Sequence, residues 1–226
     1  MDHTAAKHSM RLVTRILAFI VLLIGAIMPI TVVVLVGLLG ETTGVIVGLI
    51  GFAIMLSVFI YLANKAKLWT KNGFSSIGKT MTIGKSIGFA VAGFVIVRLY
   101  VAFLVLVIHM PPTANDQGIQ TISGTASPIL FFLALTVMAP IMEEIVFRGF
   151  LFKFFFRNQP VLALLLSAAL FGLVHGPTDL LSAATYVGMG AVFALIYYKT
   201  GRLEMSILAH ALNNLLPAVT LLMMHQ

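Results

Sequence analysis

The sequence predicts an all-α, polytopic membrane protein with about seven transmembrane helices. Of its 226 residues, 60% are hydrophobic and 9% are charged, whereas about 25% are charged in an average soluble domain. The mean hydropathy is +1.09. Because a transmembrane helix needs about 20 apolar residues, the chain has room for roughly seven. This composition excludes a water-soluble globule, a disordered chain and a coiled coil. It predicts a single transmembrane domain over residues 1–226.

Uncharged runs between ionisable residues define the predicted spans. The third run contains one charge, Arg98, for which snorkelling or a local counter-charge is the expected explanation. The fourth run begins in a polar loop, becomes apolar near Pro128 and leads into Glu143. Barrel strands would show short alternating segments instead. In chain order, the runs cover residues 16–40, 42–64, 86–115, 117–142, 159–175, 180–198 and 205–226.

Basic residues occupy one set of span ends, and the opposite set has no Lys or Arg. Glu41, Asp116 and Asp179 lie at the opposite ends from the basic residues, which are Lys7, Arg11, Arg15, Lys65, Lys67, Lys71, Lys79, Lys85, Lys153, Arg157, Lys199 and Arg202. Cytoplasmic loops carry the excess of Lys and Arg. We therefore expect a multi-pass protein of the cell membrane with a cytoplasmic N-terminus and an external C-terminus. The net charge of +7 then does not indicate a nucleic-acid partner.

Two connections are long enough to need an interpretation of their own. Residues 66–80 are basic and contain Trp69 and Phe74, which predicts an interfacial connector on the cytoplasmic face. Residues 109–127 are polar and contain Pro111 and Pro112, which predicts an external loop. The sequence does not fix the oligomeric state.

Ionisable residues gather in the fourth, fifth and seventh spans, where hydrocarbon makes them costly and therefore candidates for function. At 100° per residue, Glu144 and Arg148 lie one turn apart on one helix face and can pair. Glu143 points 100° away and has no local cation. A carboxylate in a site of low dielectric suits a general base near neutral pH. The alternative is that these residues form an ordinary helix end at the interface.

The other two spans add imidazole and amide groups. Phe171 and His175 share a helix face, and so do His210 and Asn214. Residues 143 and 175 are equidistant from the turn near residue 159, so a helical hairpin places Glu143 and His175 at similar depth. Helix rotation decides whether they face each other. Interhelical hydrogen bonding is the alternative for membrane His and Asn residues.

One carboxylate, two imidazoles and an amide can activate water and stabilise an oxyanion. Alternatively, Glu143, His175 and His210 can hold a zinc ion. The chain has no cysteine, so it offers no thiol nucleophile or thiolate ligand. It also contains no His-Glu-x-x-His motif, no Gly-x-Ser-x-Gly elbow and no phosphate loop.

Three motifs, Glu143-Glu144-x-x-x-Arg148, Phe171-x-x-x-His175 and His210-x-x-x-Asn214, resemble those of the CAAX-protease and bacteriocin-processing (Abi) family of intramembrane proteases. The resemblance covers residues 125–220, the family's protease core. It implies a polar catalytic cavity among spans four, five and seven that reaches toward the cytoplasm.

By this resemblance, Glu143 activates water with help from His175, while His210 and Asn214 bind the oxyanion. Glu144, Arg148 and Phe171 support the site. The implied mechanism needs no cofactor, and zinc is the lesser alternative. The implied substrate is a membrane-associated or hydrophobic peptide or protein, such as a lipidated protein or a bacteriocin precursor.

Two other functions compete with an endopeptidase. One is a non-catalytic self-immunity or peptide-binding protein that holds its partner in the same cavity. The other is a proton-coupled or small-ion transporter in which Glu143, His175 and His210 form a relay.

Overall fold

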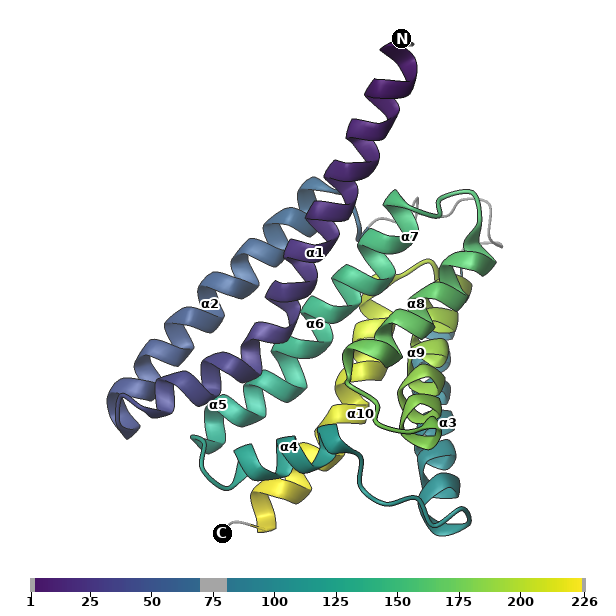
Figure 1. Cartoon of the computed structure of the whole chain (residues 1–226). Helices are drawn as coiled ribbons and strands as arrows, with labels where there is room; N and C mark the ends of the chain where they lie inside the picture. The colour runs from purple at the N-terminus through teal and green to yellow at the C-terminus, as the bar shows by residue number, and fades with distance from the viewer. Residues whose placement is uncertain (1–2, 70–80, 225–226) are drawn as a thin grey trace.

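The computed structural model describes residues 3–69 and 81–224, and all regular elements in these ranges are helical (Figure 1). The first helices are α1 (His3–Gly37), α2 (Glu41–Lys65) and α3 (Ile83–Leu106), followed by the short α4 (Ala114–Ser123). The last three are α8 (Pro160–Val174), α9 (Leu180–Thr200) and α10 (Leu203–Met224). The two described ends of the chain lie at opposite ends of the molecule (Figure 1).

Residues 128–154 form one long helical rod in which two π-helical segments interrupt the α-helix. It consists of α5 (Pro128–Leu133), the π-helical η1 (Ala134–Met138), α6 (Ala139–Glu144), the π-helical η2 (Ile145–Phe150) and α7 (Leu151–Phe154). Single π turns are rare in helices and are frequent at functional sites. Here the two π turns enclose the six residues that end in Glu143 and Glu144.

Helices are present at all seven predicted positions. Within the described residues, six are long and apolar enough to cross a membrane: Leu12–Gly37, Glu41–Lys65, Ile83–Leu106, Pro128–Phe154, Leu180–Thr200 and Leu203–Met224. The remaining helix, α8, stands at the fifth predicted span; it is apolar but has 15 residues. At about 1.5 Å per residue it falls short of a hydrocarbon core of about 30 Å.

The predicted external loop over residues 109–127 contains a helix that was not predicted. Helix α4 starts after Thr113, whose hydroxyl accepts the Asp116 amide hydrogen while the Asp116 carboxylate accepts that of Thr113. This capping box is marked by the Thr-x-x-Asp spacing.

The third span is also shorter than its predicted run, because α3 ends at Leu106, ahead of Pro111 and Pro112. From residue 70 onward, the predicted connector 66–80 lies outside the described residues.

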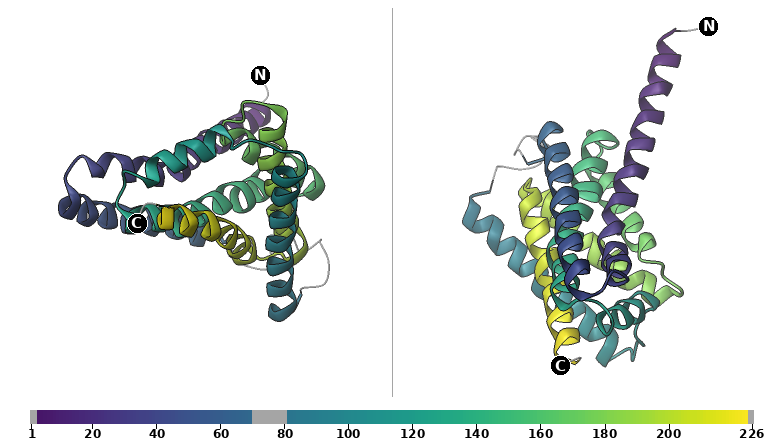
Figure 2. Two further views of the ribbon diagram at one scale, coloured as in Figure 1. Left: turned by 90° about the horizontal axis from the view of Figure 1, so that it is seen from below. Right: turned by 90° about the vertical axis from the view of Figure 1, so that its left-hand side faces the viewer.

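The long rod and α10 occupy the middle of the molecule. The α1–α2 hairpin lies on one side of them, and α3, α8 and α9 lie on the other (Figures 1 and 2). Helices α8 and α9 pack closely: a Cβ atom at Gly172 would lie 2.9 Å from the Val187 backbone nitrogen. The core between these layers is rich in fully buried aromatic rings, namely Phe131, Phe147, Phe152, Phe171 and Phe193.

Candidate active site

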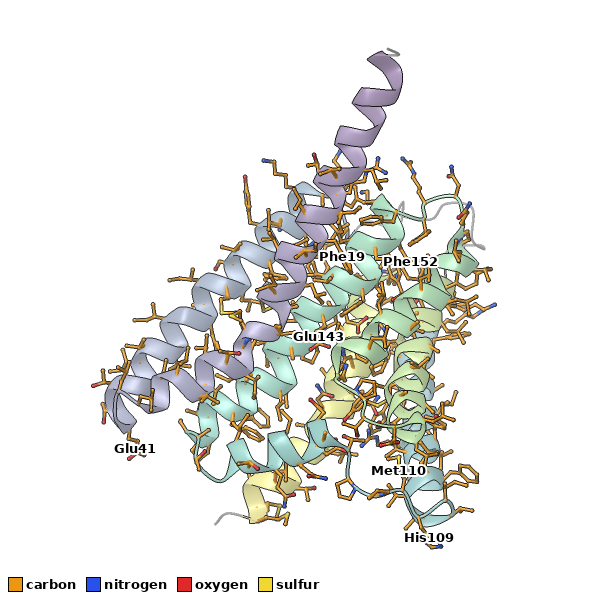
Figure 3. The ribbon with its side chains drawn as sticks, viewed as in Figure 1. Phe19, Glu41, His109, Met110, Glu143 and Phe152 are labelled. Atoms are coloured by element: carbon orange, nitrogen blue, oxygen red, sulfur yellow. The ribbon has the colours of Figure 1, made fainter. Side chains whose placement is uncertain are left out.

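A cavity of about 760 Å³ lies among α1, α3, α4, the long rod, α8, α9 and α10. Four residues predicted to be catalytic, Glu143, His175, His210 and Asn214, all line it. Figure 3 labels Glu143, which lies on the long rod near the middle of the molecule. The predicted supporting residue Phe171 also lines the cavity, whereas Glu144 and Arg148 are fully buried. The three polar helix faces therefore do meet, and the catalytic roles stay a prediction.

Glu144 forms the centre of a buried polar network. Its Oε1 accepts hydrogen bonds from Arg148 Nη1 and His210 Nδ1, each at 2.9 Å. Its Oε2 accepts one from Ser206 Oγ at 2.6 Å. The predicted pairing of Glu144 with Arg148 is therefore present, and it is completely shielded from solvent. A buried charge is tolerated when it is paired and hydrogen-bonded.

Arg148 links three helices through this network. Its Nη2 donates to the Gly190 carbonyl of α9 at 2.7 Å. Its guanidinium lies 4.6 Å from the centre of the Phe171 ring of α8, a cation–π contact. The long rod, α8 and α9 are therefore fixed relative to one another beside the cavity.

Glu143 has a different environment from its neighbour. Its Oε2 is buried and has no hydrogen-bond partner among the described residues. A buried polar atom without a partner costs free energy and calls for an explanation. Because Glu143 lines the cavity, its carboxylate is the candidate acceptor for a proton from a molecule held there.

His175 is held by two contacts, and one of them assigns its tautomer. Its Nδ1 lies 2.7 Å from the Phe171 carbonyl oxygen, which can only accept, so Nδ1 carries the hydrogen. In the neutral ring, Nε2 then holds a free lone pair. The ring also stacks on Tyr186, with 4.5 Å between centres and 15° between planes. Tyr186 donates to Asp116 of α4 at 3.1 Å, so α4 contributes to the placement of His175.

His210 and Asn214 project from adjacent turns of α10. His210 Nδ1 donates to ionised Glu144, and the ring stacks on Phe193 with 4.7 Å between centres. Asn214 Nδ2 donates to the Leu135 carbonyl, in the π turn η1, at 3.0 Å. An amide nitrogen has two hydrogens, so one remains for a ligand. Both residues thus retain a polar edge for a bound molecule.

Three polar residues of the site were not among the predicted site residues. Ser206 precedes His210 by four residues, so it shares that helix face and its spacing was a usable signal. Tyr186 gave no signal, because its partner His175 lies on another helix. Asn213, the neighbour of Asn214, accepts a hydrogen bond from Arg98 Nε at 2.9 Å. Arg98 therefore has an amide partner rather than a counter-charge.

The cavity extends toward one end of the molecule. The lining includes Asn115 and Asp116 of α4 and Thr220 of α10, which lie at the end of the molecule opposite the N-terminus. Toward the N-terminal end, the buried side chains of Phe152 and Leu203 fill the bundle. The predicted cytoplasmic N-terminus and the predicted cytoplasmic cavity therefore cannot both hold, and each stays a prediction.

The predicted zinc ligands do not form a cluster. Among the described residues, no group of three His, Asp or Glu side chains is close enough to hold a metal ion. His175 also uses Nδ1 for the Phe171 carbonyl, which leaves it one ring nitrogen. The choice between a metal-free and a zinc-dependent site stays a prediction.

Comparison with known proteins identifies the region that carries the site. Residues 125–216 match the family described as type II CAAX prenyl endopeptidase Rce1-like. This range includes all seven residues of the three motifs and excludes Arg98. The predicted family resemblance is therefore confirmed.

Curated relatives come from several bacteria. UPF0177 protein YvdC of Lactococcus lactis is 33% identical over 138 residues, which is 61% of this chain and 52% of that protein. YdiL of Bacillus subtilis, provisionally named a membrane peptidase, is 30% identical over 72% of this chain and 65% of its own. The membrane-embedded CAAX protease MroQ of Staphylococcus aureus is 29% identical over 57% of this chain and 55% of its own. The chain thus spans about half to two thirds of these relatives, and no solved structure matches it significantly.

Proposed function

Because residues 125–216 belong to the Rce1-like family, we propose that the protein is a membrane-embedded endopeptidase whose Glu143 activates the attacking water. The observation that carries this proposal is the unpartnered, buried Oε2 of Glu143 in a cavity that it shares with His175, His210 and Asn214. A general base must reach the proton that it removes. A protein that only binds a peptide has no need for such an oxygen, which disfavours the immunity alternative.

In the proposed reaction, Glu143 removes a proton from water as the oxygen attacks the scissile carbonyl carbon. His175 Nε2, whose lone pair is free in the neutral ring, accepts the second hydrogen bond of that water. The tetrahedral intermediate carries one negative oxygen. When it collapses, the C–N bond breaks and Glu143 returns its proton to the leaving amine. Each proton is accounted for without another reactant, and no step uses a metal ion.

His210 and Asn214 are proposed to stabilise the oxyanion. Asn214 has one amide hydrogen left after its bond to Leu135. His210 uses Nδ1–H for Glu144, so donation from Nε2 requires the doubly protonated imidazolium. The Glu144 carboxylate, 2.9 Å from Nδ1, supplies the counter-charge for that form. Donors fixed in advance toward a developing charge make a large contribution to catalysis.

The proposed substrate is a hydrophobic or membrane-associated peptide, for example a lipidated protein or a bacteriocin precursor. Apolar side chains from α1, α3 and α10 form much of the cavity lining, including Ile30, Val105 and Leu216. Such a lining favours apolar peptide segments. We propose that the substrate reaches the site from the end at which α4 lies.

Cleavage by purified protein in liposomes tests this function. We expect wild-type protein to cut a hydrophobic peptide with or without a chelator, and Glu143→Gln to be inactive. Activity that is lost to the chelator and restored by zinc would contradict the metal-free mechanism. Proton-dependent ion flux without cleavage would support the transporter alternative. A phenotype in cells that survives Glu143→Gln would support the immunity alternative.

A further inference from the structure

Arg98 is a cation in the interior of a membrane helix, and the proposed reaction does not use it. It lies 15 residues after the start of α3 (Ile83–Leu106) and lines the same cavity as Glu143. Its side chain is half-buried. An ionisable group at such a position is costly and indicates a function by default. Since Arg98 lies outside the matched residues 125–216, the family match does not account for it.

No carboxylate of the described chain neutralises Arg98. Glu143 and Asp116 line the cavity with it, and neither forms an ion pair with it. Asp116 is engaged by Tyr186 and by the Thr113 amide. The other titratable residues of the lining are His175, His210 and Tyr186. The two imidazoles are neutral or cationic, and the Tyr186 hydroxyl keeps the hydrogen that it donates to Asp116, so none of them supplies a negative charge.

Asn213 holds the guanidinium in place without neutralising it. Its Nδ2 donates to the Ala209 carbonyl at 2.9 Å, so its Oδ1 is the atom that faces Arg98 Nε. This bond occupies one of the five N–H groups of Arg98. Within the described residues, Arg98 makes this one hydrogen bond. The two terminal nitrogens remain free to form paired hydrogen bonds.

We propose that Arg98 binds a carboxylate of the substrate peptide inside the cavity. A planar guanidinium matches a carboxylate in a two-bond arrangement that an ammonium cannot reproduce. An apolar wall beside a fixed cation selects a hydrophobic peptide that carries one negative group. The carboxylate has two sources, the C-terminus of the peptide or the side chain of an Asp or Glu residue.

This inference rests on the proposed function for the identity of its ligand, so its test measures binding and not turnover. The protein is the Glu143→Gln variant in liposomes, which cannot cleave by the proposed route. The probes are four fluorescent peptides with one apolar sequence. Two of them differ only in a C-terminal carboxylate or amide, and two differ only in an internal Asp or Asn.

We expect one acid peptide to bind about tenfold more tightly than its neutral partner, as for a hydrogen bond to a charged group. Whichever pair shows the difference identifies the source of the carboxylate. Adding Arg98→Met should abolish the preference. Adding Asn213→Asp should also abolish it, because a carboxylate at that position neutralises Arg98 while the arginine remains. Arg202→Met removes a cation outside the cavity and should leave the preference unchanged.

Equal binding of acid and neutral peptides would overturn the inference, and so would a preference that survives Arg98→Met. If Arg98→Met does not fold, a preference that survives Asn213→Asp overturns it. These results are separable from the proposed function. A preference that depends on Arg98, without cleavage by wild-type protein, would support this inference and contradict the peptidase. Cleavage that depends on Glu143 without any preference would do the reverse.

Discussion

The adjacent residues Glu143 and Glu144 differ in their hydrogen-bond partners. Glu144 has three side-chain partners, Arg148, His210 and Ser206, whereas one oxygen of Glu143 has none among the described residues. Removing one member of a buried ion pair leaves an uncompensated charge, which costs about 3–5 kcal/mol. The free energy of unfolding should therefore fall by about that amount in Arg148→Met, because the Glu144 charge loses its strongest partner.

The matched control for this prediction is Arg202→Met. Arg202 pairs with Glu204 at 3.0 Å, and the two side chains are 16% and 38% exposed. An exposed pair contributes about 0–1 kcal/mol. Equilibrium unfolding of both variants in the same detergent measures the difference, and equal losses would contradict a structural role for the buried pair.

His210 gives the cavity a second group with a defined role. Removing one donor to an oxyanion typically lowers kcat by about 10²–10³-fold. In His210→Ala that donor is absent, and we expect a loss of about this size. Single-turnover cleavage by His210→Ala, with Arg202→Met as the control, measures the difference, and equal rates in the two variants would contradict the proposed role of His210.

At the scale of elements, the π turns η1 and η2 are the least expected feature of the fold. Each has a carbonyl bonded by a side chain from another helix: Asn214 bonds Leu135, and Ser167 bonds Phe147 at 2.9 Å. The hydropathy of residues 128–154 predicts a helix but contains no sign of its winding. These turns depend on partners far along the chain, so sequence periodicity could not reveal them.

Close packing of α8 against α9 is the element-scale basis of the site. Helix α8 carries Phe171 and ends directly before His175, and α9 carries Tyr186 and Gly190. In Gly172→Ala, the added carbon would lie 2.3 Å from Val187 Cγ2 and 2.9 Å from its backbone nitrogen, so α9 must move. Overpacking of this kind costs about 1–3 kcal/mol.

We therefore expect Gly172→Ala to lower both the thermal unfolding midpoint and the cleavage rate. The control is Gly88→Ala on α3, since an added carbon there meets no atom within 4 Å. A Gly172→Ala protein that matches Gly88→Ala in both measurements would show that the distance between α8 and α9 does not govern the site.

The candidate site was largely predictable from the sequence because its residues recur on helix faces. The spacing of Glu144 and Arg148 predicted their ion pair, and the spacing of His210 and Asn214 placed both on one face. Whether the side chains of Glu143 and His175 point into the same cavity could not be predicted from spacing, because it depends on the rotation of two helices, which packing determines. The link between Arg98 and Asn213 joins residues 115 positions apart, and spacing carries no information about such a contact.

For the whole molecule, the direction of the cavity and the orientation of the chain must be considered together. The charge pattern predicts a cytoplasmic N-terminus, and the cavity extends toward α4 at the other end. The native chain has no cysteine, so single cysteines can report each side without background. Gly118 on α4 and Asn158 before α8 are exposed positions at the two ends.

We expect a membrane-impermeant maleimide to label Gly118→Cys on intact cells and Asn158→Cys only after the cells are permeabilised. That result would place the α4 end of the cavity outside the cytoplasm. The reverse pattern would contradict the charge-based orientation and would restore the cytoplasmic cavity that the family resemblance implies. Glu41→Cys, at the start of α2, provides a second external position.

The central claim is that one carboxylate, Glu143, performs the chemistry. The most direct measurement compares peptide cleavage by Glu143→Gln and Glu204→Gln in the same liposomes. Glu204 also has a buried oxygen without a hydrogen-bond partner, but it does not line the cavity. General-base catalysis contributes about 10²–10⁴-fold to a rate. We predict a loss of at least that order in Glu143→Gln and near-wild-type cleavage in Glu204→Gln, whereas comparable rates in the two variants would contradict the assignment of Glu143 as the base.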